Sequence, residues 1–328
     1  MRNRSFLIVL GVLIAASGAE AATYRWVDPN GVVIYADRPP QAGDLARAEP
    51  AEAPAPIASD AERGAVDEFL ALSGFKQQIV AIAAKLRTEF HKRHGGLVKQ
   101  DLAVAEGIAS ARLKADALWD AFTAEFARRI DGEQMADAGT WFGSAIGRRV
   151  AELESRTGRA PDAAQELARF VARLRREPPR PERVALVQRL DAAGRATETS
   201  VEASLSLLRS MALAAAPYVP VGHGGAPGEV EGLIQRVREQ ALSQTRQMSW
   251  IMMLFVYRQL SEPELTRYVE FAESGAGQWY LGTVGRAFVH AVGVVTRGAA
   301  TELVEAVPPT RWHQTPERRE PPRPAASL

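Results

Sequence analysis

The feature that most constrains the fold is an internal repeat with a period of 130 residues. When the chain is shifted by 130 positions, apolar residues coincide in five pairs: Leu118 with Met248, Phe122 with Met252, Phe126 with Val256, Ile130 with Leu260 and Met135 with Leu265. Spacings of four and then five residues keep one apolar stripe on a helix and restart it after a turn. We therefore expect two copies of one helical unit, at about 60–176 and 182–305, joined by a proline-rich linker at 177–181.

The repeat continues into a short junction. Three further pairs coincide there: Trp141 with Phe271, Ser144 with Ser274 and Gly147 with Gly277. Read alone, Gly275-Ala276-Gly277 suggests a phosphate loop, but a dinucleotide loop needs a third glycine, where Tyr280 stands, and a preceding strand. We expect instead that the serines cap the following helices and that the glycines let helices approach closely. Asp131 and Ser261 are the predicted N-caps of the preceding helices.

Apolar spacing predicts helices elsewhere in the two copies. The first copy carries residues at helical intervals: Val66, Phe69, Leu70, Ser73, Ile79, Ile82 and Leu86, then Leu102, Val104, Ile108, Leu113 and Leu118. No alternating strand pattern of useful length appears between about 60 and 305. The predicted fold class is mainly α, a duplicated all-helical domain preceded by a small β-hairpin module.

The first 21 residues have the pattern of a secretory signal peptide. Arg2 and Arg4 precede an apolar run from Phe6 to Ala16, and small residues stand at Ala19 and Ala21. The alternative, an uncleaved anchor, needs a longer run. Cleavage after the following alanine is also compatible with the pattern. Since the chain contains no cysteine, we expect neither a lipid anchor nor disulfides, and export without disulfides fits a bacterial periplasm.

Residues 22–40 predict the β-hairpin. Two runs rich in β-branched and aromatic residues flank Asp28-Pro29-Asn30-Gly31, a strong turn sequence. Tyr24, Trp26 and Tyr35 alternate along the runs and are expected to share one face. That face either packs on the helices or forms a candidate binding surface for a glycan or a protein.

Two resemblances to known families follow from these residues. The hairpin, with Tyr24, Trp26, Asp28, Gly31, Tyr35 and the run from Asp37 to Pro40, resembles the domain of unknown function family 4124. That resemblance implies an N-terminal module of an envelope protein. The second copy, from Leu260 through Phe271 to Gly277, resembles the secreted, all-helical domain of unknown function family 2059, although Gly275 replaces an expected proline. Neither family implies catalytic residues.

The remaining segments read as connections. Residues 41–59 are rich in proline and alanine and predict a semi-extended linker. Residues 306–328 are rich in proline and arginine and predict a disordered tail. The apolar run Trp250 to Tyr257 is too short to span a membrane and predicts a buried helix.

No residue pattern predicts catalysis, a cofactor or a metal site. His91 and His94 near Glu89 are too few ligands for a metal, and His290 reads as a packed histidine. The carboxylate pairs at i, i+2, Glu152 with Glu154 and Glu262 with Glu264, point to different helix faces and read as solvated charge. Trp250, Met252, Met253 and Phe255 read as core, with an apolar ligand pocket as the alternative.

The sequence therefore supports two hypotheses about function. The formal net charge is +1, from 40 basic and 39 acidic side chains, which argues against nucleic-acid binding. The first hypothesis is a non-enzymatic periplasmic factor that binds or assembles an envelope protein or glycan. The second is a carrier of a small apolar or lipid-like ligand held between the two helical copies.

Overall fold

The computed structural model describes residues 24–27, 33–36, 60–93, 97–157, 163–218 and 227–311. From residue 60 onward the described residues form helices and turns, with no strand among them. The α-helices are α1 (Asp60–Leu72), α2 (Phe75–Arg93), α3 (Lys99–Arg112), α4 (Ala115–Ala127), α5 (Gly132–Gly143), α6 (Ala145–Thr157), α7 (Ala163–Leu174), α8 (Pro181–Gly194), α9 (Ala196–Ala215), α10 (Pro227–Val256), α11 (Glu262–Glu273) and α12 (Gly275–Ala306). Short 3-10 helices are η1 (Ala216–Tyr218), η2 (Tyr257–Gln259) and η3 (Pro309–Arg311). The predicted helical class is confirmed for this part of the chain.

Two strands precede the helices. β1 (Tyr24–Val27) and β2 (Val33–Ala36) pair antiparallel, with Trp26 opposite Ile34 and Tyr35 opposite Arg25. Because directly opposed residues occupy the same face of a ribbon, this register gives Tyr35 the opposite face from Tyr24 and Trp26. The expected common face of the three aromatics is corrected accordingly. The predicted turn at 28–31, the signal peptide and the linker lie outside the described residues.

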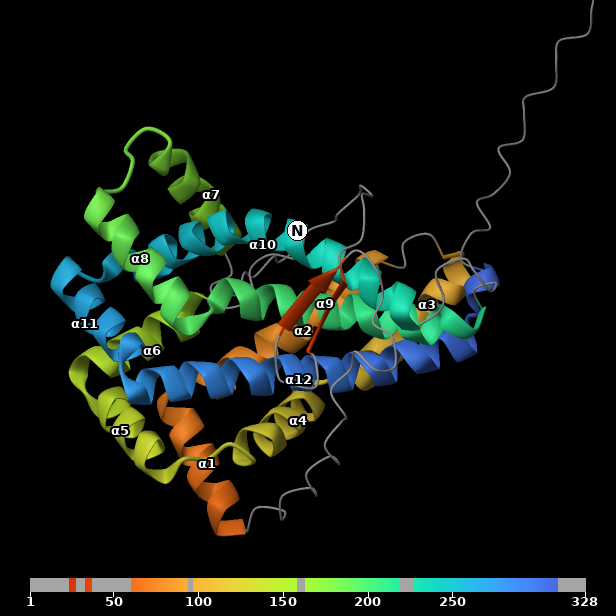
Figure 1. Cartoon of the computed structure of the whole chain (residues 1–328), viewed down its shortest axis with the longest axis horizontal. Coiled ribbons are helices and arrows are strands. Elements are labelled where there is room, and N and C mark those ends of the chain that lie inside the picture. Colours follow the sequence, from red (N-terminus) through yellow and green to blue (C-terminus); the bar gives the residue numbers. More distant parts are fainter. Residues whose placement is uncertain are drawn as a thin grey trace, which may run out of the picture.

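Helix α12 holds the helical domain together. Figure 1 shows it in blue, running along most of the molecule with α9 on one side and α4 on the other. Its packed face alternates large and small buried residues, namely Tyr280, Val284, Ala287, Phe288, Ala291, Val292, Val295, Ala299 and Leu303. The small residues let α9 approach closely, and the hydroxyls of Ser210 and Thr296 meet at 3.0 Å across that contact.

The two predicted junctions have the same geometry. Helices α5 and α11 have bounds that differ by 130 residues at both ends, and Ser144 and Ser274 follow them. The Ser144 hydroxyl accepts from the N–H of Gly147 at 3.0 Å, and the Ser274 hydroxyl accepts from the N–H of Gly277 at 3.1 Å. The predicted serine caps are confirmed. Upstream, the Asp131 carboxylate accepts from the N–H of Gln134, as expected of an N-cap.

The glycines of the junctions are needed for a close approach. A Cβ built at Gly147 would overlap the carbonyl oxygen of Trp141, and one at Gly277 would overlap that of Phe271. Each glycine thus lies against the last turn of the preceding helix, so the chain reverses sharply without a loop. The predicted close approach is confirmed.

Equivalent residues of the two copies meet each other, as they do across a two-fold axis. The rings of Trp141 and Phe271 stack, with centroids 4.0 Å apart and planes inclined by 10°. The indole of Trp279 donates to the carbonyl oxygen of Arg129 at 3.1 Å. Its equivalent, Arg149, donates to the carbonyl oxygen of Gln259 at 2.9 Å. Residue 259 is the equivalent of residue 129, so this polar contact is made twice in reciprocal form.

Two expectations about the helical region need correction. Val104, assigned to an apolar stripe, is 40% exposed, because the buried face of α3 is formed by Ala105, Ile108 and Ala109 instead. The predicted disordered tail begins too early. Val307 is fully buried, and Arg311 in η3 pairs at 2.5 Å with Asp101, a buried carboxylate of α3. The tail beyond residue 311 lies outside the described residues.

The junction geometry predicts a large effect for Gly277→Ala. Because the new methyl group has no room beside the Phe271 carbonyl, we expect the free energy of unfolding to fall by about 2–4 kcal/mol in urea titrations. Gly298→Ala is the matched control on the same helix, because a Cβ there meets nothing within 4 Å. It should leave the protein equally stable or raise its stability by about 0.5–1 kcal/mol. Equal effects of the two substitutions would contradict this account of the junction.

Candidate functional site

A cavity of about 70 Å³ lies between the two helical copies. Its walls come from α2, α5 and α6 of the first copy and from α8 to α12. Aromatic side chains dominate the lining, including Phe75, Phe142, Phe271, Phe288 and Tyr280. The only acidic residue of the lining is Glu154.

Two tyrosines hold the carboxylate of Glu154. The hydroxyl of Tyr257, in η2, donates to Oε1 at 2.6 Å, and the hydroxyl of Tyr268, in α11, donates to the same oxygen at 3.0 Å. The other oxygen, Oε2, accepts no hydrogen bond from the described residues, and it is not among the fully enclosed atoms without a partner. Glu154 is half-buried and lines the cavity, so its carboxylate keeps one oxygen that no described residue uses.

The expectation that Glu154 is solvated charge is wrong. Glu152 does point outward, where it lies 3.5 Å from Arg156 in an exposed ion pair. Glu154 lies two positions along, on the opposite side of α6, where its neighbours Val150 and Leu153 are buried. The two side chains point to different faces as predicted, but the face of Glu154 is half-buried against other helices. Glu262 and Glu264 are also half-buried, but both are engaged near the surface: Glu262 pairs with Arg180 at 2.5 Å, and Glu264 accepts from the N–H of Ser261 in a capping box.

Burial sets the ionisation of this cluster. Desolvation raises the pKa of Glu154 above its usual value, while the hydrogen bonds from Tyr257 and Tyr268 partly oppose the rise. Burial raises the pKa of both tyrosines well above the ordinary value, and the neighbouring carboxylate of Glu154 adds to the effect. Tyr280 also has a raised pKa from burial, with a hydrogen bond to Ser73 opposing it. The tyrosines are therefore hydrogen-bond donors at any physiological pH.

The internal repeat supplies a comparison for this cluster. A shift of 130 residues places Glu154 on Val284, Tyr257 on Ala127 and Tyr268 on Ala138. At this pseudo-equivalent place the chain has only apolar residues, and Val284 also lines the cavity. The second copy therefore packs with an apolar residue at the position where the first copy has the carboxylate of Glu154. The repeated fold does not by itself require the cluster.

An open groove of about 440 Å³ lies directly outside the cavity. Gly194, Thr199, Leu281 and Gly285 line both. The turn between α8 and α9 lies against α12 there: a Cβ at Gly285 would come within 2.9 Å of the Thr199 hydroxyl, and one at Gly194 within 3.5 Å of Leu281. These four residues therefore form the boundary at which the aromatic cavity adjoins a groove with charged sides.

The other sequence candidates do not form a site in the described residues. No group of three or more metal-ligating side chains occurs among them. His94 and the side chain of His91 lie outside the description. His290 is exposed at the groove, which corrects the expectation of a packed histidine. Within Trp250 to Phe255, Met252, Met253 and Phe255 are buried core, and Met253 reaches the cavity wall.

The sequence contains one signal that distinguishes Glu154 from the surface carboxylates. The repeat alignment places this acid on an apolar position of the second copy, Val284, and a charge at a core position of a repeat marks a place where the copies differ. Tyr257 and Tyr268 carried no comparable signal, because their partner lies more than a hundred residues away.

These features define the class: an all-helical protein with two like junctions, a cavity between them and a separate N-terminal segment. The family model of the Domain of unknown function (DUF4124) matches residues 10–63, which confirms the resemblance seen in the hairpin residues. No curated protein and no solved structure matches the chain. The resemblance of the second copy to the domain of unknown function family 2059 stays a prediction.

None of the described helices combines the length and apolar character that a bilayer span requires.

The raised pKa of Glu154 predicts a specific pH dependence. Between about pH 4.5 and the raised folded pKa, the folded protein keeps a proton that the unfolded chain has lost, so its free energy of unfolding falls as pH rises through that window. Glu154→Gln has no such proton and should become progressively more stable relative to the wild type from acidic to neutral pH. Urea titrations across this range measure the difference. Glu152→Gln, the exposed control, should follow the wild-type curve, and a parallel Glu154→Gln curve would refute the assignment.

Proposed function

We propose that this chain is an exported, non-enzymatic binding protein of the cell envelope, and that its helical domain binds a small ligand at the cavity between the two copies. One observation carries the proposal: Glu154, a carboxylate with one oxygen that no described residue uses, lines an aromatic cavity at a place where the pseudo-equivalent residue is Val284. The ligand that complements this site is apolar, with one hydrogen-bonding end such as a hydroxyl.

The free-energy cost of burying a carboxyl group favours a ligand-binding role for Glu154 over a purely structural one. Burying a carboxyl group is costly unless its hydrogen bonds are made, and apolar side chains of similar size often stabilise a core better. At the equivalent position of the second copy the chain has the apolar residue Val284. Small-molecule sites, in contrast, combine mostly apolar walls with a few placed polar groups. The cavity has that composition.

Size limits what the cavity can hold. At about 70 Å³ it is roughly half as large as an apolar cavity of about 150 Å³ that accepts benzene. A lipid chain does not fit inside, whereas the end of a shorter ligand does. The adjoining groove of about 440 Å³ falls within the range of ordinary ligand pockets and has room for the remainder. These volumes favour a short amphipathic ligand over the lipid-like cargo of the carrier hypothesis.

The N-terminal segment supports the proposed location. The apolar run after Arg4 has the pattern of a signal peptide, and the hairpin residues fall within the matched family segment 10–63. In this proposal the hairpin contacts an envelope protein or glycan through the ribbon face that Tyr24 and Trp26 share. Ligand binding and envelope contact then belong to different parts of the chain.

Binding of hexan-1-ol tests the cavity. In two-dimensional NMR titrations we expect shifts at residues of α6, α11 and α12 around Glu154. Glu154→Val copies the residue of the second copy and should weaken binding about tenfold, because a hydrogen bond to a carboxyl group is lost. Glu152→Val, the exposed neighbour, should bind like the wild type. The proposal fails if hexan-1-ol does not bind, or if Glu154→Val binds it equally well.

Crosslinking in intact cells tests the envelope contact. Trp26→Ala should lose the crosslinked partner that the wild type captures, because a large aromatic anchor is removed from the candidate face. Tyr35→Ala serves as the matched control, since the register places position 35 on the other face. If Trp26→Ala retains every partner, the hairpin is not the contact surface.

A further inference from the structure

The groove outside the cavity has an uneven charge balance. Its lining contains four arginines (Arg129, Arg195, Arg238 and Arg286), three glutamates (Glu125, Glu198 and Glu202) and His290. With the histidine neutral, the lining carries one surplus positive charge. The ion pairs of the groove distinguish the arginines that supply this charge from those that are neutralised.

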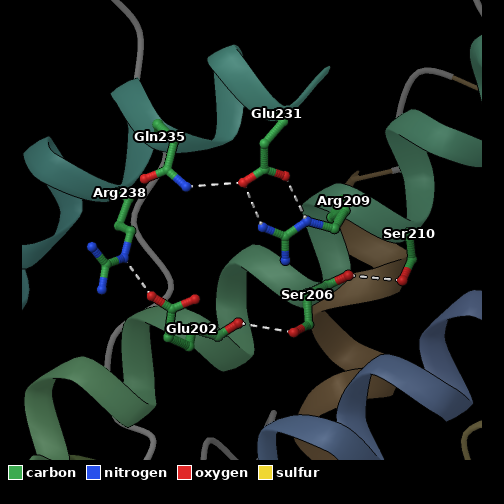
Figure 2. A network of polar contacts seen from close by, with 7 residues as sticks. All are labelled: Glu202, Ser206, Arg209, Ser210, Glu231, Gln235 and Arg238. Atoms are coloured by element: carbon green, nitrogen blue, oxygen red, sulfur yellow. Dashed lines mark hydrogen bonds and ion pairs between the residues drawn. The ribbon is translucent and has the colours of Figure 1, made fainter. Parts of the chain in front are cut away.

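Two arginines of the groove are already neutralised. Arg129 donates to Glu125 from Nε at 3.0 Å and from Nη2 at 2.7 Å. Arg238 pairs with Glu202 between α10 and α9, next to the pairing of Arg209 with Glu231 (Figure 2). These carboxylates and guanidinium groups hold helices together and are not available to a ligand without breaking a pair.

The guanidinium groups of Arg195 and Arg286 are exposed and have no hydrogen bond or ion pair with the described residues. The remaining acid of the groove, Glu198, lies 3.8 Å from Arg246 instead, a loose pair. Arg286 extends back along α12, where a Cβ at Gly282 would come within 3.4 Å of its guanidinium group. The missing side chain at Gly282 therefore gives this cation room against the helix. Both unpaired cations line the groove together with Gly194 and Leu281, which also line the cavity.

The backbone of Arg195 adopts a strained, left-handed conformation. Arg195 is the single non-glycine residue with positive φ in the described chain, at φ 49° and ψ 38°. Glycine is the usual residue for this conformation, which costs other residues about 1 kcal/mol or more. The turn is fixed by Asp191, a buried carboxylate that accepts from the N–H of Thr197 at 2.9 Å and from the indole of Trp250 at 3.0 Å. Strained backbone conformations that the surrounding structure supports cluster at functional sites. Arg195 has such a conformation at the edge of the groove.

We propose that Arg195 and Arg286 bind a carboxylate at one end of the ligand, whose apolar body then extends toward the cavity and Glu154. The inference rests on the proposed function and adds the class of ligand, a short amphipathic monocarboxylate. Both guanidinium groups line the same groove without an acidic partner, so a ligand carboxylate would meet positive charge there without breaking an ion pair. Guanidinium groups are suited to this contact, because their paired N–H donors match the geometry of a carboxylate.

The test compares two probes that differ in one group. Hexan-1-ol and 6-hydroxyhexanoate share a six-carbon chain and a hydroxyl end, and only the second carries a carboxylate. At low salt, calorimetry or ligand-observed NMR should show 6-hydroxyhexanoate binding about fivefold to tenfold more tightly. The double variant Arg195→Gly with Arg286→Gln should lose this advantage and keep the binding of hexan-1-ol. Glycine suits the backbone at 195, so the variant is expected to fold. Arg236→Gln, an exposed arginine of α10 outside the groove, is the control and should keep the advantage.

Each outcome separates the two proposals. If hexan-1-ol binds and 6-hydroxyhexanoate binds no more tightly, the carboxylate site is refuted and the cavity stands. If the advantage persists in the double variant, these arginines are not the site. If neither probe binds, both proposals fail. The advantage should also shrink at high salt, because exposed ion pairs are screened, and an advantage insensitive to salt would contradict an electrostatic contact.

Discussion

The helical domain depends on one local interaction that occurs twice, the hydrogen bond from a glycine N–H to the serine hydroxyl three residues before it. At both junctions the glycine leaves no side chain between two helices, so each helix pair reverses within a few residues. The reversal brings Trp141 and Phe271 face to face at the centre of the two copies. Helices α6 and α12 start at these junctions, and the cavity forms between them.

The proposed site lies where the two copies differ. The stack of Trp141 on Phe271 and the reciprocal contacts of Trp279 and Arg149 join equivalent positions of the two copies. The carboxylate of Glu154 and the strained Arg195 have no such counterparts. Contacts that occur in both copies stabilise the helical domain. Positions that differ between the copies can then carry residues, such as Glu154, that stability alone would not favour.

Local signals made much of this structure predictable. Helical spacing, N-cap residues and the Ser-x-x-Gly pattern act within a few residues, so the helical class and the junctions followed from the sequence. The cluster around Glu154 depends on contacts between distant helices, which no local pattern encodes. Arg195 was hidden for a related reason: Gly194 stands next to it, and sequence rules assign the left-handed position to a glycine. The early start assigned to the tail failed because Arg311 is ordered by Asp101, far away in the chain.

The position of α12 has a consequence for how the protein acquires its structure. This helix contacts α3, α4, α5, α8, α9 and α11, yet it follows all of them in the chain. As the polypeptide is made from its N-terminus, the earlier helices emerge before their shared packing surface exists. The parts of their apolar faces that α12 covers stay exposed until this last helix has been made, so the packing of the domain is completed late.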